Sequence, residues 1–153
     1  MVFETVPIHP FYIIGISVRT TNQNGQAQAD IGELWGRFLS QNLISQIPNK
    51  ESNVIYCVYT DYESDYQGPY TTILGCRVSS LEAIPPGFTG ITIPAATYQV
   101  YTSQGKLPEC VGQTWNYIWQ NAQNRKYSAD FDVYDSQSQT PESATVKTYL
   151  SVN

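Results

Sequence analysis

Asp132 lies in the segment ADFDVYD, between Phe131 and Tyr134, in a stretch with the alternation of a β-strand. A carboxylate among aromatic residues is costly to bury unless it is hydrogen-bonded, exposed to solvent or paired with a positive charge. Three interpretations stay open: a solvent-exposed strand residue, a counter-charge for a cationic ligand, and a general acid or base. Aromatic rings beside the carboxylate would add cation–π attraction of roughly 0.5–2 kcal/mol each.

Alternation along the strands groups other side chains with this carboxylate. Phe131 is expected to meet the helices, so Asp132 and Tyr134 should face the opposite side, toward a cleft. The related segment CVYTD supplies Cys57 and Tyr59 as their counterparts, and the last strand adds a tyrosine on the same side. The predicted ligand-binding residues are therefore Asp132, Tyr134, Tyr59, Trp119, Tyr149 and Cys57.

Two tryptophan segments, IGELWGRFL and VGQTWNYIW, nearly repeat one another, and Trp115 follows Trp35 by 80 positions. Each of these tryptophans is central in an apolar stripe with helical spacing, which favours a core position for both. Trp119 stands where the first segment has Leu39, and either a pocket floor or the core would explain the larger ring.

The elements around these residues also occur twice. Each copy is predicted to run strand, helix, strand, strand, and we expect one domain over residues 1–153, with repeat one at about 8–80 and repeat two at about 88–153. The fold class is α+β: the two pseudo-symmetric repeats form an antiparallel sheet with two helices on one face and a ligand cleft on the other. Strands are expected at 11–20, 54–60, 71–80, 91–102, 129–135 and 145–152, and helices from 30 to before Pro48 and over 111–122.

The composition argues against several kinds of partner. The 153 residues carry a net charge of −5 and no cluster of Lys or Arg, so direct binding of nucleic acid is not expected. Cys57, Cys76 and Cys110 are widely spaced and His9 is the single histidine, so we expect no metal site, disulfide framework or cofactor. No apolar run approaches the roughly 18 residues of a membrane span, and a cytoplasmic location is expected. Twelve tyrosines with only 14% charged residues favour aromatic side chains that line a site or fill strands.

The order of several segments resembles the GyrI-like family, the effector-binding domain attached to AraC-type and other multidrug-sensing transcription regulators of bacteria. The segments are NLISQIPNK, IYCVYTDYESDYQGPYTTILGCRVSS, IPAATYQVYTSQGKLPECVGQTWNYIW and YSADFDVYD, and together they span nearly the whole chain. In that family two repeats form a cleft lined by aromatic residues around a buried carboxylate, usually Glu in an aromatic-Glu-x-Tyr motif. The sequence here has Phe131, Asp132, Val133 and Tyr134, and the aspartate is shorter by one methylene, about 1.5 Å.

The resemblance implies a stand-alone domain that binds bulky amphipathic small molecules, including lipophilic cations, for sensing or sequestration. The residues before Phe11 leave no room for a helix-turn-helix, so DNA reading is not expected of this chain. One alternative is a hydrolase of strained cyclopropane-bearing compounds, with Asp132 as the catalytic group and Tyr59 or Tyr134 donating hydrogen bonds. Another is a protein-interaction adaptor that grips a protein partner through the tyrosine-rich segment 59–70.

Overall fold

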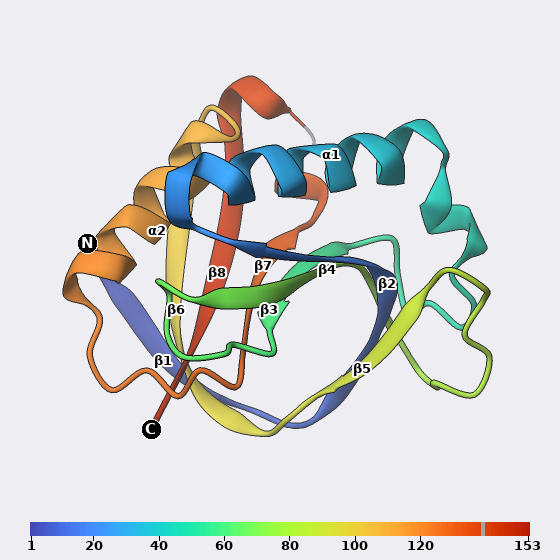
Figure 1. Cartoon of the computed structure of the whole chain (residues 1–153), viewed down its shortest axis with the longest axis horizontal. Helices are drawn as coiled ribbons and strands as arrows, with labels where there is room; N and C mark the ends of the chain where they lie inside the picture. Colours follow the sequence, from blue (N-terminus) through green and yellow to red (C-terminus); the bar gives the residue numbers. More distant parts are fainter. Residues whose placement is uncertain (139) are drawn as a thin grey trace.

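The computed structural model describes residues 1–138 and 140–153. It contains two repeats of strand–strand–helix–strand–strand (Figure 1). The first repeat comprises β1 (Phe3–Ile8), β2 (Phe11–Thr21), α1 (Gln26–Ser40), β3 (Ile55–Thr60) and β4 (Pro69–Val78). The second comprises β5 (Thr89–Ile93), β6 (Ala96–Gly105), α2 (Glu109–Asn121), β7 (Ala129–Tyr134) and β8 (Ala144–Val152). Short 3₁₀ turns lie at Gln23–Gly25, Leu43–Gln46, Ser136–Ser138 and Pro141–Ser143.

The strands form one antiparallel sheet in the order β1-β6-β8-β7-β3-β4-β2-β5. This order is unchanged when the two repeats are exchanged, so a pseudo-twofold axis passes between the central strands β3 and β7. The first strand of each repeat crosses over to the other repeat, because β1 pairs with β6 and β5 pairs with β2. Cys57 lies directly opposite Asp132 in the central pair, which puts the two equivalent residues on the axis.

The predicted fold class, α+β with two helices and an antiparallel sheet of two repeats, is confirmed, and each repeat has one more strand than expected. The predicted strand at 91–102 is divided into β5 and β6 around Pro94, because proline cannot donate to a strand ladder. The predicted first helix is also divided. It ends at Ser40, and Asn42 in the left-handed region (φ 49°) separates it from the following 3₁₀ turn.

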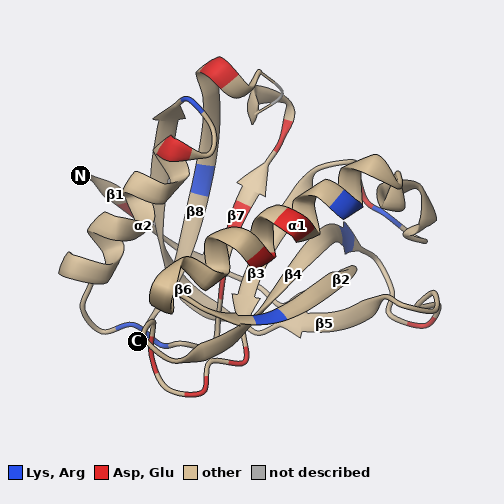
Figure 2. Cartoon of the chain, turned by 45° about the horizontal axis from the view of Figure 1, so that its top comes forward, with Lys and Arg blue, Asp and Glu red and all other residues tan. Residues whose placement is uncertain are grey.

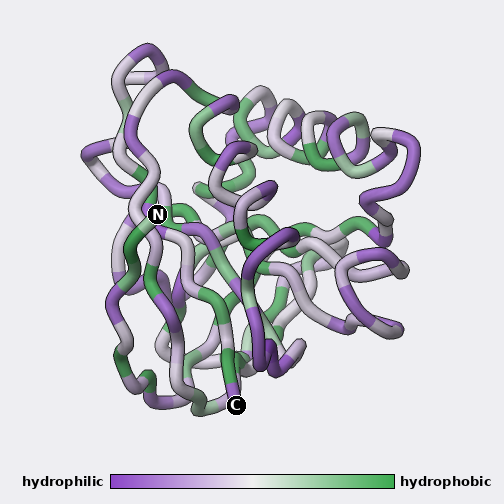
Figure 3. Tube along the Cα trace, turned by 90° about the vertical axis from the view of Figure 1, so that its left-hand side faces the viewer, coloured by the Kyte–Doolittle hydropathy of each residue, from purple (hydrophilic) through white to green (hydrophobic). Residues whose placement is uncertain are grey.

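Both helices cover the same face of the sheet. On α1, Leu34 and Phe38 pack in a cluster with Leu74 of β4. On α2, Trp115 and Ile118 pack in a second cluster with residues of β6 and β8. Hydrophobic and hydrophilic positions are interleaved along the helical coil at the top of Figure 3, as expected for a helix with one buried side.

The other face of the sheet is not an open cleft, and this part of the expectation was wrong. Phe131 and Val133 belong to a third apolar cluster on that face, together with residues from β1, β2, β5 and β6. In Figure 1 these four outer strands curve together at the lower side of the molecule. The sheet curls around this cluster, and Phe131 and Val133 of β7 point into it. Asp132 and Tyr134, which alternate with them, therefore lie on the side of the sheet that the helices cover.

Charged residues are sparse along the strands (Figure 2), and of the described strands only β1 and β7 carry acidic residues. Asp130 and Asp132 of β7 are both fully buried, and this makes them the unusual electrostatic feature of the sheet.

Among the described residues, no helix combines the length and the apolar composition needed to cross a membrane.

Candidate functional site

A cavity of about 560 Å³ lies between α1 and α2, above the central strands. This volume is in the range of small-molecule sites, about 300–1,000 Å³. Eight aromatic side chains line it, from both helices, the central strands β3 and β7, the loop between β3 and β4, and the start of β4. They are Trp35, Tyr59, Tyr62, Tyr66, Tyr70, Trp115, Trp119 and Tyr134.

The aromatic walls follow the pseudo-twofold axis. The Trp35 ring meets the Tyr134 ring edge to face, with the ring centres 4.8 Å apart. The equivalent pair, Trp115 and Tyr59, meets in the same way at 5.2 Å. Each helix therefore packs its tryptophan on the tyrosine of the other repeat, and this crossed arrangement holds the two helices apart over the cavity.

Asp132 lies beneath the cavity and does not line it, because Tyr59 and Trp115 cover its carboxylate. The Tyr59 hydroxyl donates a hydrogen bond to Asp132 Oδ2 at 2.6 Å. The Trp115 indole N–H lies 3.2 Å from both carboxylate oxygens, and the Thr148 hydroxyl donates to Oδ1. Every described partner of this carboxylate is thus a donor, and two of them belong to the cavity wall.

Burial raises the pKa of Asp132 from 3.8 to about 6, although hydrogen bonds from Thr148, Tyr59 and Trp115 act to lower it. Burial also raises the pKa of the neighbouring Cys57 thiol, so that its S–H remains a donor, 3.4 Å from the Tyr59 oxygen. A carboxylate whose ionisation is opposed by its own surroundings is typical of functional sites. The ionised form would gain from any positive charge placed in the cavity.

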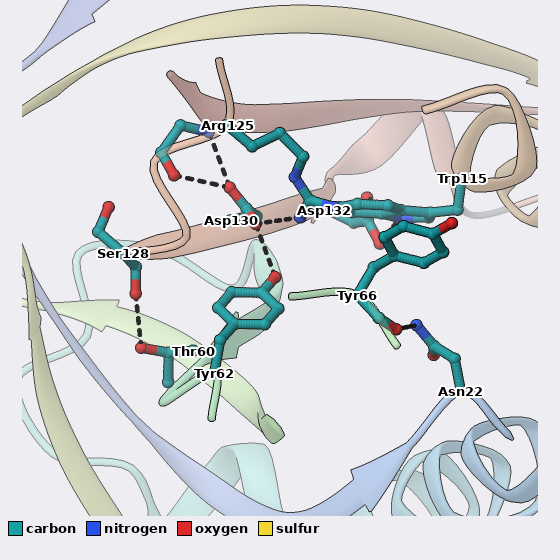
Figure 4. Close-up of polar contacts among 10 residues, drawn as sticks. Asn22, Thr60, Tyr62, Tyr66, Trp115, Arg125, Ser128, Asp130 and Asp132 are labelled. Atoms are coloured by element: carbon teal, nitrogen blue, oxygen red, sulfur yellow. Dashed lines mark hydrogen bonds and ion pairs between the residues drawn. The ribbon is translucent and has the colours of Figure 1, made fainter. Parts of the chain in front are cut away.

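A second buried carboxylate, Asp130, is already paired. Arg125 donates to Asp130 Oδ2 at 2.9 Å and Tyr62 donates to the same oxygen at 2.6 Å (Figure 4). The backbone N–H and the hydroxyl of Ser151 donate to Oδ1. Since the Arg125 charge offsets that of Asp130, the charge of Asp132 is the uncompensated one under the cavity.

The loop between β3 and β4 closes one end of the cavity. The Tyr66 ring stacks on Trp119 of α2, with the ring centres 6.0 Å apart and the planes 10° from parallel. Asn22 holds this loop by donating from Nδ2 to the Tyr66 carbonyl at 2.9 Å (Figure 4). The loop therefore joins the end of β2 to α2 across the cavity.

Two glycines at equivalent positions widen the cavity. Gly32 on α1 and Gly112 on α2 both line it, and a Cβ at either position would have no neighbour within 4 Å. Glycine inside a helix costs roughly 1 kcal/mol relative to alanine. The two helices thus carry a destabilising residue at the point where a side chain would occupy the cavity.

The structure brings together five of the six predicted site residues. Tyr59, Tyr134 and Trp119 line the cavity, while Asp132 and Cys57 lie under its floor on the same side of the sheet. Tyr149 does not join them. It stacks on Phe131 at 4.7 Å, on the opposite face, because the residues of β7 and β8 alternate in register.

Sequence reasoning missed other residues of the cavity. Trp35 and Trp115 were expected to be core residues, although their duplicated Gly-x-x-Trp pattern already indicated a shared role. Arg125 gave no signal, since it follows α2 in an irregular segment. Within the described part of the chain, no three His, Cys, Asp or Glu side chains gather as metal ligands.

The sequence is similar to known proteins over most of its length. The family model described as Cass2, integron-associated effector binding protein, matches residues 5–152. YobU of Bacillus subtilis (strain 168), whose name proposes a transcriptional regulator, is 29% identical over 143 residues, 90% of this chain and 89% of its own length.

Solved structures share the fold. The integron cassette protein VCH_CASS2 from the mobile metagenome of Vibrio cholerae is 26% identical, with a TM-score of 0.75 over 100% of this chain and 97% of its own. The protein SAV2435, solved bound to tetraphenylphosphonium, is 22% identical, with a TM-score of 0.82 over 100% of this chain and 94% of its own.

Proposed function

The chain belongs to the Cass2 family of integron-associated effector-binding proteins, and from this premise we propose that it binds a bulky, amphipathic cation in the aromatic cavity between α1 and α2. One observation carries the proposal: the uncompensated, fully buried Asp132 carboxylate lies directly under two rings of the cavity wall. SAV2435, which has the same fold, was solved with a lipophilic cation of this kind.

The carboxylate would act on the ligand through these rings. The Tyr59 O–H and the Trp115 N–H both point at Asp132, so their polar hydrogens are turned toward the carboxylate. Ring faces are negative and attract cations by roughly 0.5–2 kcal/mol each. A carboxylate at the polar end of a ring adds its own attraction. At an effective dielectric constant of about 20, charges about 8 Å apart gain about 2 kcal/mol, roughly thirty-fold in affinity.

Binding fits this arrangement better than the two alternatives. As a hydrolase, the chain would need Asp132 to reach its substrate, but Tyr59 and Trp115 lie between the carboxylate and the cavity. As an adaptor, it would need free tyrosines in the 59–70 segment. The Tyr62 hydroxyl bonds to Asp130, and the Tyr66 ring stacks on α2, so both are engaged within the molecule.

Tetraphenylphosphonium and tetraphenylborate test the proposal, because they have nearly the same size and shape and opposite charges. Isothermal titration calorimetry at pH 8 should show binding of the phosphonium and at least tenfold weaker binding of the borate. Asp132→Asn should weaken phosphonium binding by about ten- to thirty-fold and strengthen borate binding, and so remove most of this preference. Glu82→Gln, a matched change at an exposed residue outside the cavity, should leave it unaltered.

Equal affinity for the two ions would refute the role of charge. A preference that survives Asp132→Asn would show that the cavity selects cations without this carboxylate. Absence of phosphonium binding in the wild-type protein would refute the proposed ligand class.

A further inference from the structure

Arg125 is buried at the cavity with most of its hydrogen-bonding capacity unused. Its side chain is 5% exposed, and one of its nitrogens, Nη2, bonds to Asp130. The other two nitrogens, Nε and Nη1, are buried and have no hydrogen-bond partner among the described residues. A buried donor of a charged group without an acceptor is costly, so a residue in this state requires an explanation.

The ion pair with Asp130 does not supply that explanation. Asp130 accepts four hydrogen bonds, one each from Arg125 and Tyr62 and two from Ser151. Its acceptor capacity is therefore used, while the guanidinium has donors to spare. A lysine could neutralise Asp130 without burying the additional N–H groups of a guanidinium.

Aromatic rings surround the guanidinium and leave it against the cavity. Its central carbon lies 4.2 Å from the centre of the Tyr127 ring and 5.8 Å from the centres of the Tyr62 and Trp115 rings. In Figure 4 the Arg125 side chain extends from its loop toward Trp115. Arg125 and Trp115 both line the cavity, so a ligand against this tryptophan would also lie beside the guanidinium.

We propose that the ligand carries a hydrogen-bond acceptor, a carbonyl or carboxylate oxygen, that Arg125 binds through its unpaired N–H groups. This inference rests on the proposed function and narrows its ligand class, from lipophilic cations in general to cations that also bear an oxygen acceptor.

The strand geometry sets the spacing of the two groups. Asp130 and Asp132 are two residues apart on the same side of β7, which separates them by about 7 Å. The positive centre of the ligand is expected over the Asp132 side, where Tyr59 and Trp115 form the wall. The acceptor is expected near Arg125, which is paired with Asp130. The oxygen should therefore lie on the order of 7 Å from the cationic centre.

A matched pair of probes tests this assignment. (4-Oxopentyl)triphenylphosphonium and (4-methylpentyl)triphenylphosphonium share the cation and the chain length, but the first has a ketone oxygen where the second has a methyl group. The wild-type protein should bind the ketone about tenfold more tightly by calorimetry. The ratio of the two dissociation constants is the readout, because a general effect on folding or on cation binding cancels in it.

Arg125→Met combined with Asp130→Asn should bring the ratio close to one, since it removes both charges of the ion pair and leaves no N–H donor on the side chain at position 125. If this variant does not fold, Arg125→Leu combined with Asp130→Asn tests the same ratio with another side chain that has no donor. Arg37→Met, a change at an exposed arginine of α1 outside the cavity, should keep the tenfold preference.

Equal binding of the two probes by the wild-type protein would overturn the inference and leave cation binding intact. A preference for the ketone that persists in Arg125→Met combined with Asp130→Asn would overturn it as well, because the acceptor would then bind elsewhere. Binding of neither probe would overturn both this inference and the proposed function.

Discussion

Replacing Gly112 by alanine should make α2 more stable and the cavity less able to hold a ligand. Gly112 lies in the middle of the helix surface that lines the cavity, and the space beside it is open. Gly32 occupies the equivalent place on α1. A methyl group at either position meets no protein atom within 4 Å, so it would project into space that the ligand needs.

The alanine substitution should increase the free energy of unfolding and weaken ligand binding, by free energies of comparable size. Alanine is favoured over glycine inside a helix by about 0.8–1.0 kcal/mol, so each variant should gain about 1 kcal/mol in the free energy of unfolding. For a chain of this size that gain raises Tm by about 2–4 °C. Crowding a filled cavity typically costs about 1–3 kcal/mol, which corresponds to roughly five- to hundred-fold weaker ligand binding.

Gly36 provides the control within the same helix. A Cβ at Gly36 would also have no neighbour within 4 Å, but Gly36 does not line the cavity. Gly36→Ala should therefore give the same increase in stability as Gly32→Ala and no change in affinity for tetraphenylphosphonium. Urea denaturation measures the first quantity and calorimetry the second.

Binding of the phosphonium by Gly32→Ala and Gly112→Ala as tight as by Gly36→Ala would refute this role of the two glycines. A loss of stability in these two variants would refute it as well, because the glycines would then be required by the backbone and not by the cavity.

Three other changes probe the carboxylate and its surroundings. The pKa of Asp132 is about 6 in the folded protein against 3.8 for an ordinary aspartate, so the folded state binds more protons between these values. The free energy of unfolding should then fall by about 2 kcal/mol as pH rises from 4 to 6, whereas cation affinity should rise; denaturation and titration of wild type and Asp132→Asn over this range check both signs. Tyr59→Phe removes a hydrogen bond that lowers the Asp132 pKa, so the midpoint of the pH dependence of binding should move upward, and an unchanged midpoint would contradict the contact. Tyr149 lies on the far face of the sheet, so Tyr149→Phe should leave the phosphonium Kd within twofold of wild type; a larger loss of affinity would place the ligand elsewhere.

Local patterns in the sequence were sufficient to predict the two repeats and to single out Asp132. The duplicated Gly-x-x-Trp segments predicted two equivalent helices, and Gly32 and Gly112 belong to that duplication. Asp132 was recognisable because a carboxylate flanked by aromatic residues in a strand is expensive to bury. These inferences depend on residues close together in the chain. The structure has the two equivalent helices, and Asp132 is a buried residue of β7, although on the helix side of the sheet.

The crossing of the first strand of each repeat could not be predicted in the same way. The segment 3–8 has weak alternation, and it becomes a strand because β6 of the other repeat offers it an unpaired edge. Arg125 is similar, since its surroundings depend on Tyr62 from the loop after β3 and on how the segment after α2 folds back to bring Tyr127 and Asp130 to the same guanidinium.

By itself, the sequence determined that Asp132 and Tyr134 share one side of their strand and that Phe131 lies on the other. Only the tertiary structure decided which side meets the helices. Alternation defines two faces of a strand but carries no information about what covers each face. That is settled by how the whole sheet bends, and here the sheet curls around the cluster of apolar and aromatic residues on the face away from the helices. The helices therefore cover the mixed face, where the gap between them leaves a cavity above a buried carboxylate.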